Sequence, residues 1–131
     1  MEDLKAKFII SENIDEKRIE DFVIRLSQFC KVSKSGGIII ERAELTNIEK
    51  IKVSLVARYL ANRLDSEISP EVNSEELSNS LMISKDQVLA RLKEFRDEKF
   101  AFRVTKGIYK VNPLQIESFL SSLENKYMVR S

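Results

Sequence analysis

Three helix-start signatures in the second half of the chain constrain its fold more than any other feature. Each has an Asn or Ser followed three residues later by Glu or Gln, which is the pattern of a capping box. The three pairs are Asn73 with Glu76, Ser84 with Gln87, and Asn112 with Gln115. In each pair a side-chain oxygen can accept a hydrogen bond from a free amide of the first helical turn, and flanking apolar residues can set the entry angle of the chain. Because the apolar period restarts at each signature, we expect three separate helices.

The first two of these helices are close enough in the sequence to form a helix-turn-helix. The first has room only for the residues from Ser74 to about Met82, so it must pack on neighbours through its leucines, because an isolated helix that short is marginal in water. The second begins after Ser84 and carries Val88, Leu92 and Phe95 on one face. Two helices joined by about three residues cross at a wide angle, as in a helix-turn-helix.

The stretch after the second helix alternates as a β-hairpin does. Its first half is expected to place Phe100, Phe102 and Val104 on one face, with the aromatic residues in the core. Its second half is expected to place Tyr109 and Val111 on one face. Lys106 and Gly107 separate the halves, and the glycine tolerates the positive φ that a tight hairpin needs.

The first 64 residues predict further elements. The apolar run from Lys5 to Ile10 predicts a strand, and a helix is expected to start at Asn13, with Glu16 completing its capping box, and to extend as far as Cys30. The run of three isoleucines from Ile38 predicts a second strand. Another helix is expected from Thr46, capped with Glu49, to about Arg63, and it should bury five apolar residues: Ile48, Ile51, Leu55, Tyr59 and Leu60.

From Thr46 to Asn112 the expected order is helix, helix, turn, helix and β-hairpin. Leu77, the run ISKDQVLARL and the hairpin FRVTKGIYKV resemble the winged helix-turn-helix DNA-binding family over about half of the chain. We therefore expect an α+β, mainly α, fold with a winged helix-turn-helix core, flanking amphipathic helices and a small N-terminal strand-helix-strand segment. The expected units are residues 1–45 (N-terminal extension), 46–112 (winged helix-turn-helix) and 113–131 (C-terminal helix).

The resemblance implies that the second helix of the motif enters the major groove of double-stranded DNA, and that the hairpin tip, or wing, reaches the backbone or minor groove. The matching positions are Ser84, Lys85, Gln87, Ala90 and Arg91 on the helix, and Arg103, Thr105, Lys106 and Lys110 on the wing. Two interpretations of Gln87 stay open: it reads an adenine, or it only completes its capping box.

The distribution of charge supports DNA binding only in part. Residues 84–112 contain eight Lys or Arg against four Asp or Glu, a net charge of +4, whereas residues 66–83 have four Glu and no cation. The face of the second helix that points away from its apolar side, however, contains Asp86, Glu94 and Asp97, and acids are unfavourable beside phosphates. The net charge of the whole chain is only +1. An adaptor that binds another protein is therefore the alternative function.

The last helix carries an apolar stripe: Ile116, Phe119, Leu120, Leu123 and Tyr127. One interpretation is that this stripe covers the small core of the same chain. The other is that it forms a two-fold homodimer interface, in which case the DNA site would also be two-fold symmetric.

Composition excludes several classes of protein. Without His and with one cysteine, Cys30, the chain offers no Cys/His zinc site and no internal disulfide, so we expect no cofactor and a reducing, cytoplasmic location. No glycine-rich phosphate loop is present, and the acid pairs lie at helix starts, so we expect no enzyme activity. No apolar run approaches the roughly 18 residues of a membrane span. A charged fraction of 33%, rich in Lys and Glu, is typical of thermophiles.

Overall fold

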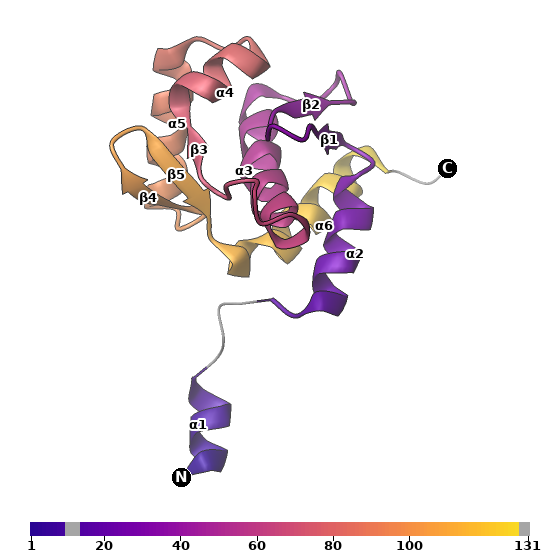
Figure 1. The fold of residues 1–131 in the computed structure, drawn as a ribbon, viewed down its shortest axis with the longest axis vertical. Coiled ribbons are helices and arrows are strands. Elements are labelled where there is room, and N and C mark those ends of the chain that lie inside the picture. The colour runs from indigo at the N-terminus through magenta and orange to yellow at the C-terminus, as the bar shows by residue number, and fades with distance from the viewer. Residues whose placement is uncertain (10–13, 129–131) are drawn as a thin grey trace.

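A long central helix, α3 (Asn47–Leu64), organises the fold. In the computed structural model, which describes residues 1–9 and 14–128, α3 packs against α2, α4, α5 and strands of both sheets (Figure 1). The expected capping box is present, since Thr46 Oγ1 accepts from Glu49 N at 3.1 Å and Glu49 Oε1 accepts from Thr46 N at 2.8 Å. Buried residues lie on all sides of α3, as expected for a helix surrounded by other elements. Ile48 is 37% exposed, so its expected burial is wrong: it lies in the first turn, at the edge of the core.

The first residues of the chain form a helix where a strand was expected. The prediction of a strand from Lys5 to Ile10 is wrong, because residues Glu2–Phe8 form helix α1. Ile10 lies outside the described residues. A strand needs a partner for its backbone groups, whereas this helix satisfies its own, as in the bond from Lys5 N to Met1 O at 3.1 Å. Helix α2 (Glu16–Leu26) has Asp15 as its N-cap; the expected cap Asn13 also lies outside the described residues.

A small hairpin follows α2. Strands β1 (Cys30–Val32) and β2 (Ile38–Ile40) pair antiparallel, with Cys30 opposite Ile40. The expected second strand is therefore confirmed, but the expected extension of the helix to Cys30 is wrong. The helix ends at Leu26 because the chain turns there to pair with β2, and Phe29 and Cys30 reach the core from the turn and the strand.

Apart from one additional short strand, the second half of the chain has the expected element order. Strand β3 (Val72–Asn73) and helices α4 (Ser74–Leu81) and α5 (Lys85–Asp97) precede strands β4 (Ala101–Thr105) and β5 (Ile108–Val111). The three strands form one sheet in the order β3-β5-β4. The strand β3 was not expected. Residues from all three expected units, between Ile14 and Leu123, meet in one hydrophobic core.

Strand β4 presents the opposite face from the one expected. Ala101 is buried and pairs with Val111, whereas Phe102 is 37% exposed and Val104 is 43% exposed. The expected core position of Phe102 is therefore wrong. Phe100 is buried, as expected, but it precedes the strand, so it does not set the alternation of β4.

The C-terminal helix α6 (Ile116–Tyr127) follows a 3-10 turn at Pro113–Gln115, which Asn112 caps through its side chain. Ile116, Phe119, Leu120 and Leu123 are buried within the chain, and the Tyr127 ring packs edge-on against Phe29 with centroids 6.4 Å apart. The apolar stripe is thus covered by the chain's own core. Four of the five stripe residues are buried and Tyr127 is half-buried, which favours the first interpretation, and a dimer interface at this stripe stays a prediction.

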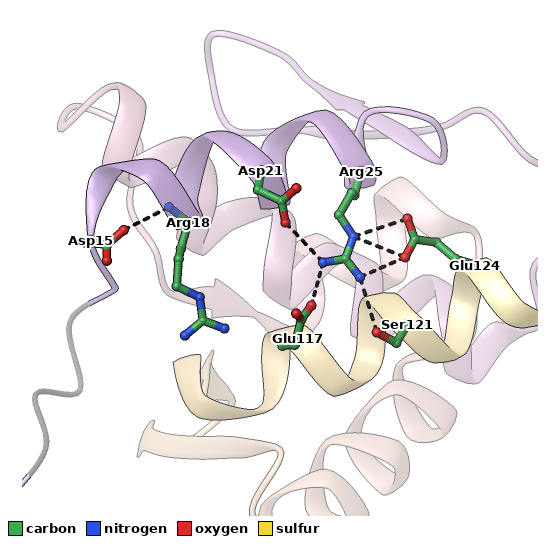
Figure 2. Close-up of polar contacts among 7 residues, drawn as sticks. All are labelled: Asp15, Arg18, Asp21, Arg25, Glu117, Ser121 and Glu124. Carbon is green, nitrogen blue, oxygen red and sulfur yellow. Dashed lines mark hydrogen bonds and ion pairs between the residues drawn. The ribbon is translucent and has the colours of Figure 1, made fainter. Parts of the chain in front are cut away.

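Polar contacts hold α2 and α6 together along their edge. The Arg25 guanidinium from α2 donates to Glu124 at 2.7 Å and to Ser121 at 3.3 Å, both on α6, and also contacts Glu117 and Asp21 (Figure 2). Hydrogen bonding to Glu124 is the largest of several effects that raise the pKa of Arg25. Arg25 therefore stays charged and cross-links the two helices.

Candidate nucleic-acid interface

The turn between α4 and α5 is built from local hydrogen bonds. Met82 ends α4 in the left-handed conformation (φ 57°), and the Ser78 hydroxyl donates to the Ile83 carbonyl oxygen at 2.6 Å. Ser84 then caps α5 by accepting from Gln87 N at 3.3 Å. Ile83 and Val88, the apolar pair that flanks the cap, are both buried. These contacts leave Ser84, Lys85 and Gln87 exposed at the start of α5.

The surface of α5 carries charges of both signs. Val88, Leu92 and Phe95 are buried as expected, and Asp86, Ala90, Lys93, Glu94 and Asp97 are exposed. Arg91 Nη1 lies 3.1 Å from Glu94 Oε2, and Arg96 Nη2 lies 3.4 Å from Asp97 Oδ1. The two arginines are therefore paired with acids of their own helix, and the middle and end of α5 offer phosphates little net attraction.

The β4–β5 hairpin is held to the start of α4 by β3. Val72 pairs with Tyr109 and Asn73 with Ile108. Ser74 N donates to the Gly107 carbonyl oxygen at 2.8 Å, and a Cβ on Gly107 would lie 3.2 Å from Ser74 Oγ. Gly107 also has φ of 76°. The glycine is therefore required both by the turn and by the close approach of α4, and the hairpin tip has a defined position.

The cations of the hairpin lie on both of its faces. Arg103 is opposite Tyr109, and Phe102 is opposite Lys110. Directly paired residues share a face and successive residues alternate, so Arg103 and Lys110 are on opposite faces. A single flat surface cannot contact both, whereas a groove that admits the hairpin can. Thr105 and Lys106 are exposed near and at the tip.

Most of the site residues expected from the sequence are accessible. Arg91 is half-buried and ion-paired, whereas the others are exposed: Ser84, Lys85, Gln87, Ala90, Arg103, Thr105, Lys106 and Lys110. Within residues 1–9 and 14–128, no ion pair engages Lys85, Arg103, Lys106 or Lys110. The Ser74 contact that positions the wing was missed, because the only sequence signal for β3 was Val72 beside the cap residue Asn73.

Three further features of the described part of the chain concern metal ligands, membrane spans and the single thiol. No three Asp, Glu, Cys or His side chains gather there as metal ligands do. None of its helices is both long enough and apolar enough to cross a membrane. Burial raises the pKa of Cys30 to about 12, which keeps this thiol protonated.

Comparison with known proteins found no match to a family model, a curated protein or a solved structure. The functional argument therefore depends on the geometry and chemistry of the site.

Proposed function

We propose that this chain is a winged helix-turn-helix protein that binds double-stranded DNA in the cytoplasm and regulates transcription. The observation that carries the proposal is the contrast between the cations of α5 and those of the hairpin. Arg91 and Arg96 are paired with acids on α5, whereas Arg103, Lys106 and Lys110 are exposed and free of ion pairs in the part of the chain that the structure describes. Free cations gain most from phosphates, because they lose no existing partner.

The hairpin is accordingly the principal contact in this proposal. Its cations on two faces suit insertion of the tip into a groove, where phosphates line both sides. The start of α5 adds the exposed side chains of Lys85 and Gln87. Deep insertion of α5 is unfavourable because Glu94 and Asp97 would approach the backbone.

A protein-binding adaptor is the second candidate, and the exposed acids of α5 favour it. Asp86, Glu94 and Asp97 give this face a mixed charge that suits a protein partner better than a polyanion. Phe102 and Val104 add exposed apolar area on β4, an edge strand of its sheet.

The test is a titration of random-sequence duplex DNA followed by fluorescence anisotropy at two salt concentrations. With about four phosphate contacts, we expect binding to weaken roughly 100-fold between about 50 and 200 mM salt. Lys106→Glu should weaken binding at low salt and lower the salt slope by about one. The matched control is Lys34→Glu, the same charge change on an exposed lysine of the turn between β1 and β2.

A second variant separates the two candidate functions. Glu94→Gln removes the partner of Arg91 and one acid from α5, so it should strengthen DNA binding several-fold if DNA approaches this helix. Absence of binding at low salt, or equal losses in Lys106→Glu and Lys34→Glu, contradicts the DNA proposal and favours the adaptor.

A further inference from the structure

A small polar pocket lies where α3, the end of α5 and the start of α6 meet. Its volume is about 200 Å³, below the roughly 300–1,000 Å³ of pockets that hold drug-sized ligands, so it suits a smaller molecule. Lys52 of α3 and Glu98 at the end of α5 line it, and the rings of Phe100 and Phe119 give it an apolar wall. We call it the Lys52 pocket.

The Lys52 ammonium group has a defined position in this pocket. Lys52 Nζ lies 5.0 Å from the ring centroid of Phe95 and 4.7 Å from that of Phe100, and both distances are within the range of cation–π contacts. The side chain is only 23% exposed. In the described part of the chain its one ion-pair contact is with Glu98 Oε2 at 3.9 Å, which is too long for a hydrogen bond. Lys52 is therefore a fixed and partly desolvated cation.

Three polar side chains also line the pocket. Gln115, Ser118 and Ser122 follow one another at spacings of three and four residues, so they lie on one face of this helical segment. Within residues 1–9 and 14–128, neither these side chains nor the Lys52 ammonium group takes part in a hydrogen bond. The pocket therefore offers donors and acceptors that these parts of the chain do not use.

We propose that the Lys52 pocket binds the charged groups of a small free amino acid. The carboxylate of the ligand accepts from Lys52, and its ammonium group donates to Glu98, whose side chain is 61% exposed at the edge of the pocket. Both contacts are charge-assisted hydrogen bonds, which are stronger than neutral ones. The serine hydroxyls and the Gln115 amide can bond to either group, and Phe100 and Phe119 contact the carbon atoms of the ligand.

The two opposite charges of the pocket select a zwitterion over a simple ion. An anion that approaches Lys52 is repelled by Glu98, and a cation that approaches Glu98 is repelled by Lys52, because the two groups are only 3.9 Å apart. The carboxylate and ammonium groups of an α-amino acid are attached to the same carbon atom, so they can meet both partners at once. None of the lining residues belongs to the candidate nucleic-acid interface, and the inference does not depend on the DNA proposal.

Chemical-shift titration of the ¹⁵N-labelled chain tests the inference without nucleic acid. The probes are glycine and L-alanine, and the matched controls are sodium acetate and methylammonium chloride, which each carry one of the two charges. We expect saturable shifts of the amides of residues 98–100 and 115–122 with both amino acids, at a Kd of about 1 mM or below. Each control should bind at least about tenfold more weakly, because it forms only one of the two charge-assisted bonds.

Two substitutions each remove one charge and keep the shape of the pocket. Lys52→Met keeps the stem above the two rings, and Glu98→Gln keeps the length of an exposed side chain, so it leaves the core intact. Each should weaken glycine binding about tenfold. The matched controls are Lys93→Met and Glu94→Gln, the same changes at exposed positions of α5 outside the pocket, which should leave glycine binding unchanged.

Any of three results overturns the inference. One is the absence of saturable shifts at these amides with glycine and L-alanine up to about 10 mM, ten times the highest expected Kd. Another is that acetate or methylammonium binds as tightly as glycine, which would make the pocket a site for simple ions. The third is that Glu98→Gln weakens glycine binding no more than Glu94→Gln does. If Lys52→Met fails to fold, the comparison of the two glutamate variants decides.

Discussion

Arg58 and Glu76 form an ion pair that joins the middle of α3 to the first turn of α4. The Arg58 side chain is 7% exposed, and it also donates to the carbonyl oxygens of Ser69 at 2.8 Å and Gly36 at 3.3 Å. A Cβ on Gly36 would lie 3.2 Å from Arg58 Cζ. One buried cation therefore connects α3 with three other parts of the chain. Arg58 also binds the carboxylate of Glu76, which was expected to complete the capping box of α4. Asn73 alone therefore caps that helix.

Replacement of Arg58 by alanine should lower the free energy of unfolding by about 2–4 kcal/mol, because two carbonyl oxygens lose their donor and a buried volume is emptied. Urea unfolding followed by circular dichroism measures the change. The matched control is Arg63→Ala on the exposed side of the same helix, which should cost less than about 0.5 kcal/mol. Equal costs for the two variants would contradict the central role of Arg58.

The loss of stability caused by replacing Arg25 should depend on the salt concentration. Arg25→Ala removes the cation shared by Asp21, Glu117 and Glu124, so three carboxylates are left close together on α2 and α6 (Figure 2). We expect a loss of roughly 1–2 kcal/mol at low salt, part of which is recovered at high salt because salt screens the repulsion. Thermal unfolding at two ionic strengths tests this, with Lys17→Ala on α2 as the control. A salt-independent loss would mean that packing, not charge, dominates.

We expect the protein to lose stability at acid pH because of Glu49. Burial alone would raise the pKa of Glu49, but hydrogen bonds from Tyr127 and the Thr46 backbone, and then from Lys126, outweigh it and lower the pKa to about 2. The unfolded chain has the ordinary value near 4.5. A carboxyl group whose pKa is lowered in the folded state contributes its full stabilisation at pH values above its unfolded-state pKa. This stabilisation is lost as the pH falls from about 4.5 to about 2. The side chain is 14% exposed, and the expected loss is on the order of 2–3 kcal/mol.

Unfolding free energies between pH 6 and pH 2.5 check this expectation. Glu49→Gln cannot titrate, so its curve should be flatter than that of the wild type by about the same amount. If the two curves run parallel, Glu49 is not the group responsible. Other carboxylates titrate equally in both proteins and cancel in the comparison.

Met82 should be a site where glycine stabilises the fold. Its φ is 57° and its side chain is 92% exposed, so it has backbone strain without compensating burial. Met82→Gly relieves that strain and should raise the free energy of unfolding by roughly 0.5–1 kcal/mol, after the entropy of glycine in the unfolded chain is subtracted. Met82→Ala keeps the strain and should change it little. If the alanine variant gains as much as the glycine variant, relief of strain is not the cause.

The sequence predicted best those features that depend on neighbours in the chain. The start of α3 with its capping box, the caps Asn73, Ser84 and Asn112, and the glycine turn of the hairpin all involve contacts within a few residues. The apolar side of α5 was also predicted, because a helix with period 3.6 shows its buried face in the sequence. The accessible residues of the candidate site on α5 follow from the same periodicity.

The errors arose where a distant partner decides the structure. Residues 5–8 are helical because no described strand pairs with them, and Cys30 left its expected helix because Ile40 pairs with it. Phe102 turned outward because Ala101 pairs with the buried Val111. The α6 stripe left two interpretations open, because a sequence shows that a face is apolar but not which element covers it.

By itself, then, the sequence determined where the helices from α3 onward begin and which of their faces are apolar, because caps, turns and the helical period act over one or two turns of chain. Only the tertiary structure decided which faces meet: that the apolar face of α6 packs into the core and that Arg58 joins α3 to α4. Those outcomes depend on contacts between residues far apart in the sequence. Their energies come from burial and from ion pairs, which no local pattern encodes.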